Sequence, residues 1–278
     1  EAATADNPVL TMFEQVMQRQ VELICQWQAL GFIHGVMNTD NMLLSGETID
    51  YGPCAFMDQF EAAKVFSSID VNGRYAYNNQ PAIANWNLAG LAQTLLPLLD
   101  DNEEVAAEMA QASLDSFHDR YLVCYLANFS SKLGLTTSLE GDELLIAEFL
   151  DLLEANQCDF TLAFRRLNDL ATGDNSIGTL FDFPQTFQDW IAKWQIRLEL
   201  ENADSQTRRQ LMNKSNPVFI PRNHLVEQAI SEAYAGDFAF FHRLYDRLMT
   251  PFSYDRKDAE LALPPTTEQV ISKTFCGT

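Results

Sequence analysis

The chain has 278 residues, 47% of them hydrophobic, and its 39 acidic and 18 basic residues give a formal net charge of −21. That length and hydrophobic content suffice for a substantial core, arranged as one large domain or two closely packed ones. The negative charge argues against nucleic acid or an anionic membrane surface as a partner, and no apolar run approaches the roughly 20 residues of a membrane span.

Hydrophobic residues recur at helical spacing along most of the chain, so the sequence predicts a mainly α fold. The first predicted helix runs from about residue 8 to residue 30 and stops at Gly31. Further helices are predicted over 88–99, 103–133, 142–156, 160–170, 187–201, 224–235 and 238–248. Trp86 and Asn87 are expected to act as structural anchors. After Pro251 the chain is expected to continue as an extended tail.

Two oxygen-bearing side chains between the first two predicted helices suit a divalent metal. Asn41 and Asp50 stand on either side of a stretch with apolar residues around a Ser-Gly turn at 45–46. That pattern predicts a short β-hairpin with Asn41 at its entry and Asp50 at its exit. Amide and carboxylate oxygens are hard ligands that Mg²⁺ accepts together with water and substrate phosphates. Asn41 and Asp50 are therefore predicted to share one metal ion.

The spacing of polar residues here matches the catalytic and metal-binding loops of protein kinases. His34 precedes Asn41 at the kinase spacing, and Asp50 and Gly52 form the Asp-x-Gly triplet that follows the hairpin. One position departs from the pattern, because Val36 stands where kinases carry the aspartate that accepts a proton. Valine cannot accept a proton, so phosphoryl transfer by the usual kinase route is not expected.

The block of residues 31–53 resembles the selenoprotein O family of pseudokinases. Three further segments support the resemblance, at 73–89, 216–224 and 275–278. The resemblance implies a protein-kinase-like carboxyl-terminal lobe with one small β-hairpin and additional carboxyl-terminal helices, the amino-terminal lobe being absent. It also implies an activity, since this family transfers AMP, rather than phosphate, from ATP to Ser, Thr or Tyr hydroxyls of proteins.

The same resemblance implies roles for individual residues. Asp40 is the expected general base, while Asn41 and Asp50 are the expected ligands of Mg²⁺, with Mn²⁺ as the alternative ion. Asp50 is also expected close to the phosphates of the co-substrate ATP. Asp40 stands beside a metal ligand, so it can reach a hydroxyl held near a metal-bound phosphate. His34 is expected to brace the loop, because no second His or Cys stands at metal-ligand spacing.

Cations are missing from the sequence around the predicted site. No Lys or Arg occurs between Arg19 and Lys64, although six acidic residues fall in that interval. Nucleotidyl and phosphoryl transfer need cations directed at the developing charge, and metal supplies only part of that. In the resembled family the amino-terminal lobe carries the lysine and arginines that bind ATP. The chain is therefore expected to be a carboxyl-terminal portion with little or no activity alone.

Three regions are predicted: a kinase-like core over 1–135, a helical extension packed on it over 136–250, and an extended tail over 251–278. The five cysteines lack metal-binding spacing, which favours a reducing compartment. That compartment is the cytoplasm for a bacterial protein and the mitochondrion for a eukaryotic one. Cys276 stands where animal members of the family carry selenocysteine, and a reversible disulfide with Cys54 is one hypothesis for it.

Two other functions remain open from the sequence. One is a kinase-like phosphotransferase with Asp40 replacing the missing base, and the residues do not distinguish AMP transfer from UMP transfer. The other is a non-catalytic nucleotide-binding scaffold whose acidic helical surface recruits partners. Retention of both Asn41 and Asp50 argues against the scaffold, because binding partners alone requires neither.

Overall fold

The computed structural model describes residues 2–170, 176–182 and 184–275. That part of the chain contains ten α-helices and one two-stranded antiparallel sheet. The predicted mainly α fold is therefore confirmed. No helix in the described ranges is both long enough and apolar enough to cross a membrane.

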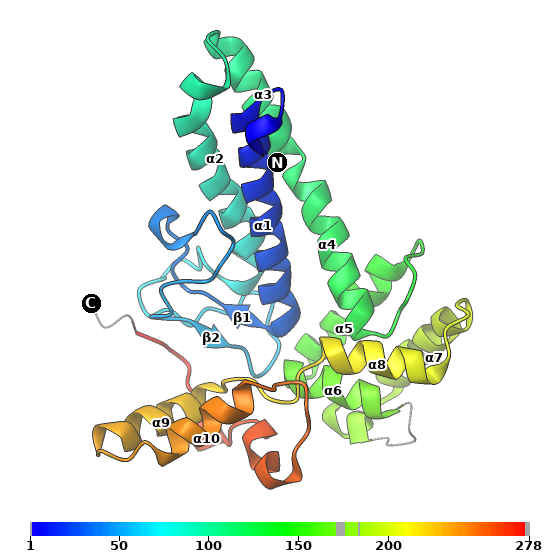
Figure 1. Ribbon diagram of the computed structural model, residues 1–278. Helices are drawn as coiled ribbons and strands as arrows, with labels where there is room; N and C mark the ends of the chain where they lie inside the picture. Colours follow the sequence, from blue (N-terminus) through cyan, green and yellow to red (C-terminus); the bar gives the residue numbers. More distant parts are fainter. Residues whose placement is uncertain (1, 171–175, 183, 276–278) are drawn as a thin grey trace.

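Four helices form a long bundle at the amino-terminal end of the molecule (Figure 1). They are α1 (Pro8–Leu30), α2 (Gln80–Leu99), α3 (Glu103–Asp115) and α4 (Phe117–Lys132). The side chain of Asn7 accepts a hydrogen bond from the Leu10 N–H and so caps the start of α1. Gly31 ends α1 with a left-handed φ of 70°, a conformation that glycine adopts without steric cost.

The structure corrects two of the predicted helices in this bundle. The predicted helix over 103–133 is broken at Ser116, whose hydroxyl and N–H both donate to the carbonyl of Ser113. A serine side chain that bonds to nearby main chain competes with the regular helical ladder. Helix α2 begins at Gln80 rather than near residue 88. The prediction missed its first turns because the buried polar residues Gln80 and Asn87 interrupt the apolar pattern on its inner face.

The remaining helices form two groups below the bundle, on opposite sides of the molecule in Figure 1. The first group holds α5 (Asp142–Ala155), α6 (Phe160–Leu170), α7 (Pro184–Glu199) and α8 (Ser205–Ser215). The second holds α9 (Asn223–Tyr234) and α10 (Ala239–Leu248). The ranges predicted from the sequence included no counterpart of α8, a mostly exposed helix that lacks an apolar stripe.

The sheet corrects the predicted hairpin. Its strands are β1 (Phe32–Ile33) and β2 (Ala55–Phe56), paired with Phe32 opposite Phe56 and Ile33 opposite Ala55. Between them the predicted 42–50 hairpin is reduced to a single antiparallel bridge from Met42 to Thr48. The segment 34–54 is therefore closed at its base by β1 and β2, which flank it, and not by strands within it.

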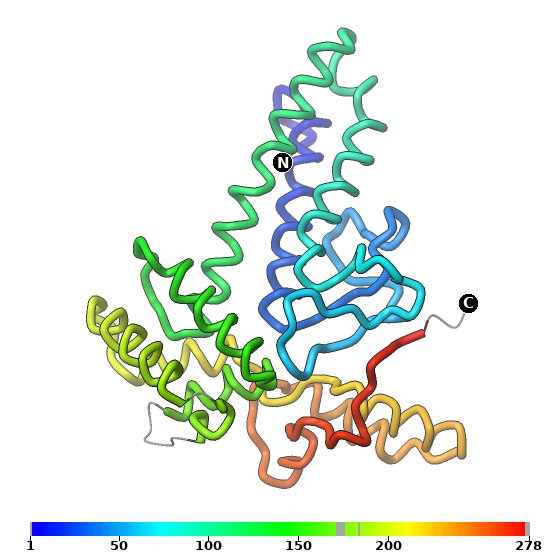
Figure 2. Tube along the Cα trace, turned by 180° about the vertical axis from the view of Figure 1, so that it is seen from behind, coloured from blue at the N-terminus to red at the C-terminus, as the bar shows by residue number. Residues whose placement is uncertain are grey.

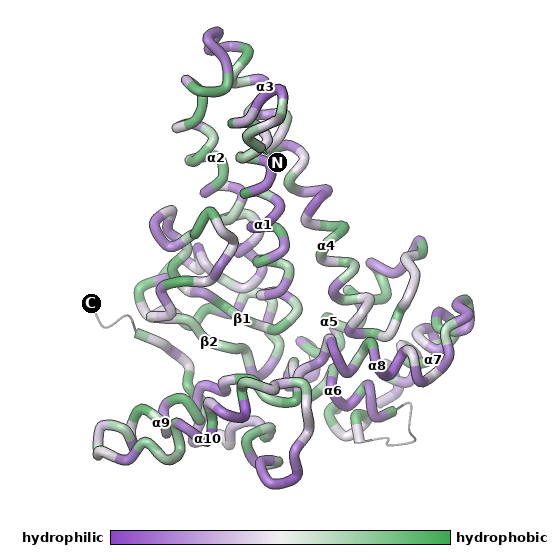
Figure 3. Tube along the Cα trace, viewed as in Figure 1, coloured by the Kyte–Doolittle hydropathy of each residue, from purple (hydrophilic) through white to green (hydrophobic). Residues whose placement is uncertain are grey.

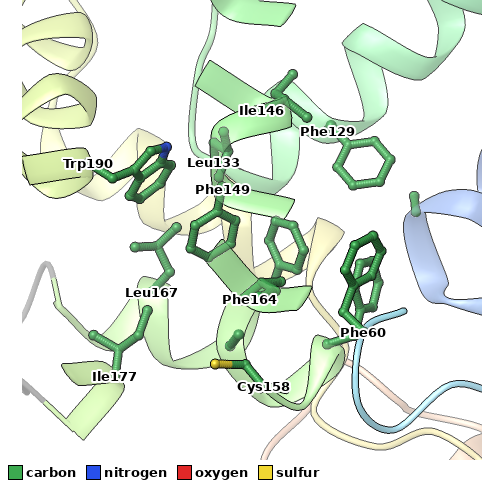
Figure 4. Packing of buried hydrophobic residues seen from close by; sticks show 14 of the residues in the cluster. Phe60, Phe129, Leu133, Ile146, Phe149, Cys158, Phe164, Leu167, Ile177 and Trp190 are labelled. Atoms are coloured by element: carbon green, nitrogen blue, oxygen red, sulfur yellow. The ribbon is translucent and has the colours of Figure 1, made fainter. Parts of the chain in front are cut away.

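Buried hydrophobic residues form three clusters, and hydrophobic segments occur in every part of the trace in Figure 3. The largest combines aromatic side chains from α4, α5, α6 and α7, as Figure 4 shows for Phe129, Phe149, Phe164 and Trp190. It also includes Phe60, so it takes residues from both sides of the predicted boundary at 135. The first two predicted regions therefore share one hydrophobic cluster, and the boundaries of all three regions stay a prediction.

A buried arginine ties the α9–α10 group to the rest of the molecule. Arg222 is 1% exposed and forms ion pairs with Asp58 at 2.6 Å and Asp159 at 2.7 Å. The neighbouring Asn223 side chain donates to the carbonyl of Phe56, the last residue of β2. Removing one partner from such a buried pair leaves an uncompensated charge, so this contact fixes where α9 starts relative to the sheet.

One buried lysine has no carboxylate beside it within the described ranges. Lys132, at the end of α4, is 1% exposed, and its ammonium lies 4.2 Å from the ring centroid of Phe164 and 5.3 Å from that of Phe160. Burial in this aromatic environment lowers the pKa of Lys132 from 10.5 to about 7. Folding therefore favours the neutral amine.

Replacing Lys132 with methionine tests this pKa shift through the pH dependence of stability. Between about pH 7 and pH 10 the unfolded lysine binds more proton than the folded one, so this group makes wild-type stability rise with pH. Lys132→Met lacks that contribution. The wild type should therefore gain unfolding free energy relative to Lys132→Met as the pH rises, by on the order of 1 kcal/mol per pH unit.

The measurement is urea denaturation of both proteins at several pH values from 7 to 9.5. Lys214→Met, at an exposed position on α8, is the matched control and should follow the wild type in parallel. Parallel curves for Lys132→Met and the wild type would contradict the lowered pKa.

Candidate functional site

The predicted site residues lie on one irregular excursion that is closed at its base. β1 and β2 pair at its two ends, and the N–H of Met57 donates to the carbonyl of Gly31 at 2.8 Å. Residues 34–54 between these ends have almost no regular structure. Their main chain must find its hydrogen-bond partners elsewhere, because buried backbone groups are costly to leave unpaired.

His34 joins the two halves of this excursion. The ring is fully buried, its Nδ1 accepts from the Val36 N–H at 3.3 Å, and its Nε2 therefore carries the proton donated to the Ile49 carbonyl at 2.8 Å. Burial lowers the pKa of His34, while the hydrogen bond to Ile49 and the charge of Asp50 oppose that shift. The predicted bracing role of His34 is confirmed.

Gly35 brings the same two halves into direct contact. Its φ is +84°, and a Cβ placed there would lie 3.0 Å from the Pro53 carbonyl oxygen and 3.3 Å from Ser67 Cβ. Any side chain would combine left-handed backbone strain with overlap against main chain. Glycine is thus required where the segment carrying Asp40 passes the segment that follows Asp50.

Side-chain amides from α2 hold the first half of the excursion. Gln80 accepts from the His34 N–H at 3.0 Å and donates to the Phe32 carbonyl at 2.9 Å. About two turns further along the same face of α2, Asn87 donates to the Met37 carbonyl at 3.0 Å. Asn87 is therefore the structural anchor that the sequence suggested. Gln80 was not singled out, and its only signal was a polar residue on the inner face of an otherwise apolar helix.

Side chains from α1 hold the turn in the middle. Gln20 donates to the Leu43 carbonyl at 2.6 Å, and the indole N–H of Trp27 donates to the Thr48 hydroxyl at 3.0 Å. Gly46 lies so close to α1 that an added Cβ would be 2.7 Å from Arg19 Cβ. The turn is consequently packed along the helix rather than projecting into solvent.

The turn places the predicted metal ligands at one end. Met42 faces Thr48 across an antiparallel bridge. Asn41 directly precedes Met42 and Asp50 comes two residues after Thr48, so both lie at the open end of the turn. Asn41 donates through Nδ2 to the Val36 carbonyl at 3.0 Å, which leaves its Oδ1 without a hydrogen bond from any described residue. Asp50 is exposed with a left-handed φ of 53°, and its carboxylate is likewise unpaired there.

Asp40 lies in the short 3₁₀ turn Thr39–Asn41, directly before Asn41. Its carboxylate is exposed and accepts no hydrogen bond from the described chain. The three predicted side chains therefore occupy one end of one loop with oxygen atoms free. No cluster of three or more His, Cys, Asp or Glu suitable for a metal occurs in the described ranges, so a metal here would depend on the Asn–Asp pair and on substrate.

The carboxyl-terminal tail runs past this loop, as Figure 2 shows from behind. Thr274 pairs in parallel with Ser67, its N–H donates to the Phe66 carbonyl at 2.8 Å, and its hydroxyl donates to the Pro53 carbonyl. Burial raises the pKa of the Cys54 thiol to about 11. The hypothesised partner Cys276 lies outside the described residues.

A large cleft opens beside Asp50. Its volume is about 1050 Å³, and its wall combines the end of α1, the sheet, one side of α9 along its whole length and the tail. Residues lining it include Trp27, Tyr51, Cys54, Phe56, Asn223 and Phe275. The lining is mainly apolar with a few polar groups, which is the usual character of a small-molecule site.

Comparison with known proteins shows which family the chain resembles. A family model described as protein adenylyltransferase SelO matches residues 1–249. The chain belongs to the SelO family. It is 48% identical over its full length to a protein nucleotidyltransferase YdiU of Rhodopseudomonas palustris strain HaA2, covering 57% of that relative. It is also 48% identical to the YdiU of Geobacillus kaustophilus, with 99% of this chain and 56% of the relative covered.

The chain thus spans a little over half the length of the SelO-family relatives that it matches. These relatives are bacterial proteins, and a YdiU of Rhizobium etli shows 47% identity over 99% of the chain. The resemblance inferred from residues 31–53 is confirmed at the level of the family.

The contact at Gly35 gives a test of how the SelO-family loop is held. Gly35→Ala adds a Cβ in a left-handed conformation against the Pro53 carbonyl. We expect it to lower the unfolding free energy by about 2 kcal/mol or more. The measurement is urea denaturation followed by far-ultraviolet circular dichroism.

Gly236→Ala is the matched control, because Gly236 has a similar φ of +89° but nothing within 4 Å of an added Cβ. It should show the backbone strain alone, about 1 kcal/mol. Equal losses in the two variants would show that the approach of Gly35 to Pro53 contributes nothing.

Proposed function

We propose that the full-length protein containing this chain transfers AMP from ATP to Ser, Thr or Tyr hydroxyls of other proteins. The observation that carries the proposal is the position of Asp40, Asn41 and Asp50 at the open end of a loop braced by His34, with oxygen atoms that no described residue engages. Membership of the SelO family and the nucleotidyltransferase names of its relatives support the same reaction class.

Asn41 and Asp50 fit a Mg²⁺ ion by the chemistry of their oxygen atoms. The Asn41 amide is turned by its bond to the Val36 carbonyl, so that the amide oxygen remains available. Mg²⁺ requires hard oxygen ligands and commonly takes one or two from protein, with water and phosphate oxygens as the rest. When bound, the ion would neutralise charge on the triphosphate. Mn²⁺ suits the same ligands.

Asp40 is proposed as the general base. Its exposed carboxylate accepts the hydroxyl proton as the acceptor oxygen attacks the α-phosphorus, and the bond between that phosphorus and the β-phosphate oxygen breaks to release pyrophosphate. Val36, at the usual kinase position, offers no atom for this proton. The cleft beside Asp50 is proposed to take part of the nucleotide, since its wall offers Trp27 and Tyr51.

The isolated chain is proposed to have little turnover. Residues 20–63, which include the whole site loop, contain no Lys or Arg, and transfer from a triphosphate requires cations in contact with phosphate. Lys273 is the only Lys or Arg among the described residues that line the cleft, and we propose that the further cations come from the portion of the relatives that this chain does not span. Measurable transfer by the 278-residue chain alone would refute this.

The labelling test uses the full-length protein with Mg²⁺ and ATP carrying the label at either the α- or the γ-phosphate. We expect stable α-label on protein and none from the γ-position, and loss of the label in Asp50→Asn. Asp151→Asn, an exposed substitution on α5, is the matched control and should label like the wild type. Transfer of γ-label would establish a kinase, and no label a scaffold; either result would overturn the proposal.

Substitutions of Asp40 and Asp50 are expected to affect rate and affinity differently. Asp40→Asn should lower the transfer rate by about 10²- to 10⁴-fold, the usual contribution of a general base, and leave Mg²⁺·ATP affinity nearly unchanged. Asp50→Asn should weaken that affinity as well. Isothermal titration with a non-hydrolysable ATP analogue, paired with initial rates, separates the two effects. Unchanged rates in Asp40→Asn would remove Asp40 from the base role.

A further inference from the structure

A rigid turn at residues 70–75 presents an arginine beside the site loop. The Asp70 carboxylate accepts the N–H groups of Arg74 and Tyr75, one on each oxygen, both at 2.8 Å. Gly73 supplies a left-handed φ of 65°, and the Asn79 side chain donates to its carbonyl at 2.7 Å. With both oxygens of Asp70 used by main chain, the turn is fixed and the Arg74 side chain is left to other contacts.

Those contacts are aromatic. The Arg74 guanidinium lies 4.7 Å from the ring centroid of Trp86 and 5.7 Å from that of Tyr75. No described carboxylate is within ion-pair distance of Arg74, although the chain carries 39 acidic residues. Trp86 is 56% exposed, so its role as a structural anchor stays a prediction. Stacking holds the guanidinium in place while its N–H donors stay available.

This arginine–aromatic cluster borders the segment that carries Asp40. The Tyr75 hydroxyl donates to the Asn38 side-chain oxygen at 2.7 Å. One helical turn after Trp86, Gly90 faces Thr39, because a Cβ added at Gly90 would lie 3.8 Å from the Thr39 methyl. Two independent contacts therefore place the cluster next to residues 38–40.

We propose that Arg74, Tyr75 and Trp86 form a docking surface for the acceptor protein, in which Arg74 binds a carboxylate near the acceptor hydroxyl. The inference rests on the proposed role of Asp40 as base. Arginine binds carboxylates through two parallel hydrogen bonds, and Arg, Trp and Tyr dominate the energetics of protein interfaces.

Two features favour an acidic segment of a protein as the occupant. The net charge of −21 means that most of the surface repels an acidic segment. Arg74, a cation without a described carboxylate partner, is a place where such a segment can bind. Beyond Gly90, α2 and the loop also border a groove of about 290 Å³ lined by Thr39, Met42, Leu44, Gly90 and Leu91. That groove offers space for an apolar side chain of the same segment.

The first test measures binding to the 278-residue chain without any chemistry. Trp27, Trp190 and Trp194 are at most 5% exposed, so quenching of tryptophan emission by acrylamide reports mainly on Trp86. The probes are a short serine peptide flanked by glutamates and its twin with glutamines. We expect the acidic peptide to protect Trp86 and to bind about three- to tenfold more tightly than its twin.

Arg74→Ala should abolish that preference, and Arg74→Lys should retain only part of it, because lysine lacks the planar fork. Arg209→Ala, at an exposed position on α8, is the matched control and should keep the full preference. Arg74 is exposed, so thermal unfolding of Arg74→Ala should match the wild type. Equal binding of the two peptides, or a preference that survives in Arg74→Ala, would overturn the proposal.

The second test separates this inference from the proposed function. In the full-length protein, Arg74→Ala should raise KM for the acidic serine peptide and leave both kcat and KM for ATP unchanged. An unchanged peptide KM alongside normal AMP transfer would overturn the docking surface alone. Absence of any AMP transfer with Arg74-dependent peptide binding intact would overturn the proposed function and leave the docking surface standing.

Discussion

The site depends on one constraint, which is that an irregular buried main chain must be given hydrogen-bond partners by side chains. Residues 34–54 have no strand neighbours, so Gln80 and Asn87 from α2 and Gln20 from α1 supply the partners. His34 adds a bond from one half of the loop to the other. Each of these side chains is buried, where an unmade hydrogen bond costs most. The loop is therefore anchored to both α1 and α2.

That order has an electrostatic consequence. Anchoring through neutral amides and a neutral histidine places three oxygen-bearing side chains together on a loop that itself contains no Lys or Arg. Asp40 and Asp50 remain exposed acids, and Asn41 keeps its amide oxygen free. Such an arrangement is suited to attract a divalent cation, and without one its two carboxylates repel a triphosphate. The nearest cations come from other segments of the fold, since the cluster that contains Arg74 borders residues 38–40 and Lys273 lines the adjoining cleft.

Local patterns predicted the helices whose apolar face is continuous and failed where tertiary contacts interrupt it. Helix α6 has the predicted limits, 160–170, because Phe160, Phe164 and Leu167 form an apolar stripe along its buried side, although Thr161 and Asn168 are buried there too. The start of α2 was missed because Gln80 and Asn87 serve the loop instead of the core. The hairpin was predicted over 42–50, yet only Met42 and Thr48 pair, since the turn bonds to α1 in preference to itself. At the site, the candidate residues were recognisable, and the amides that hold them were not.

The sequence alone determined the residue types of the site, their order and the family, because Asn41, Asp50 and the spacing to His34 are properties of the chain itself. Only the tertiary structure decided what surrounds them. Arg74 and Trp86 are distant from Asp40 along the chain, and they border its loop because α2 packs against it. Contacts between distant segments depend on how helices pack, and packing is a collective property of the whole core that no local pattern contains.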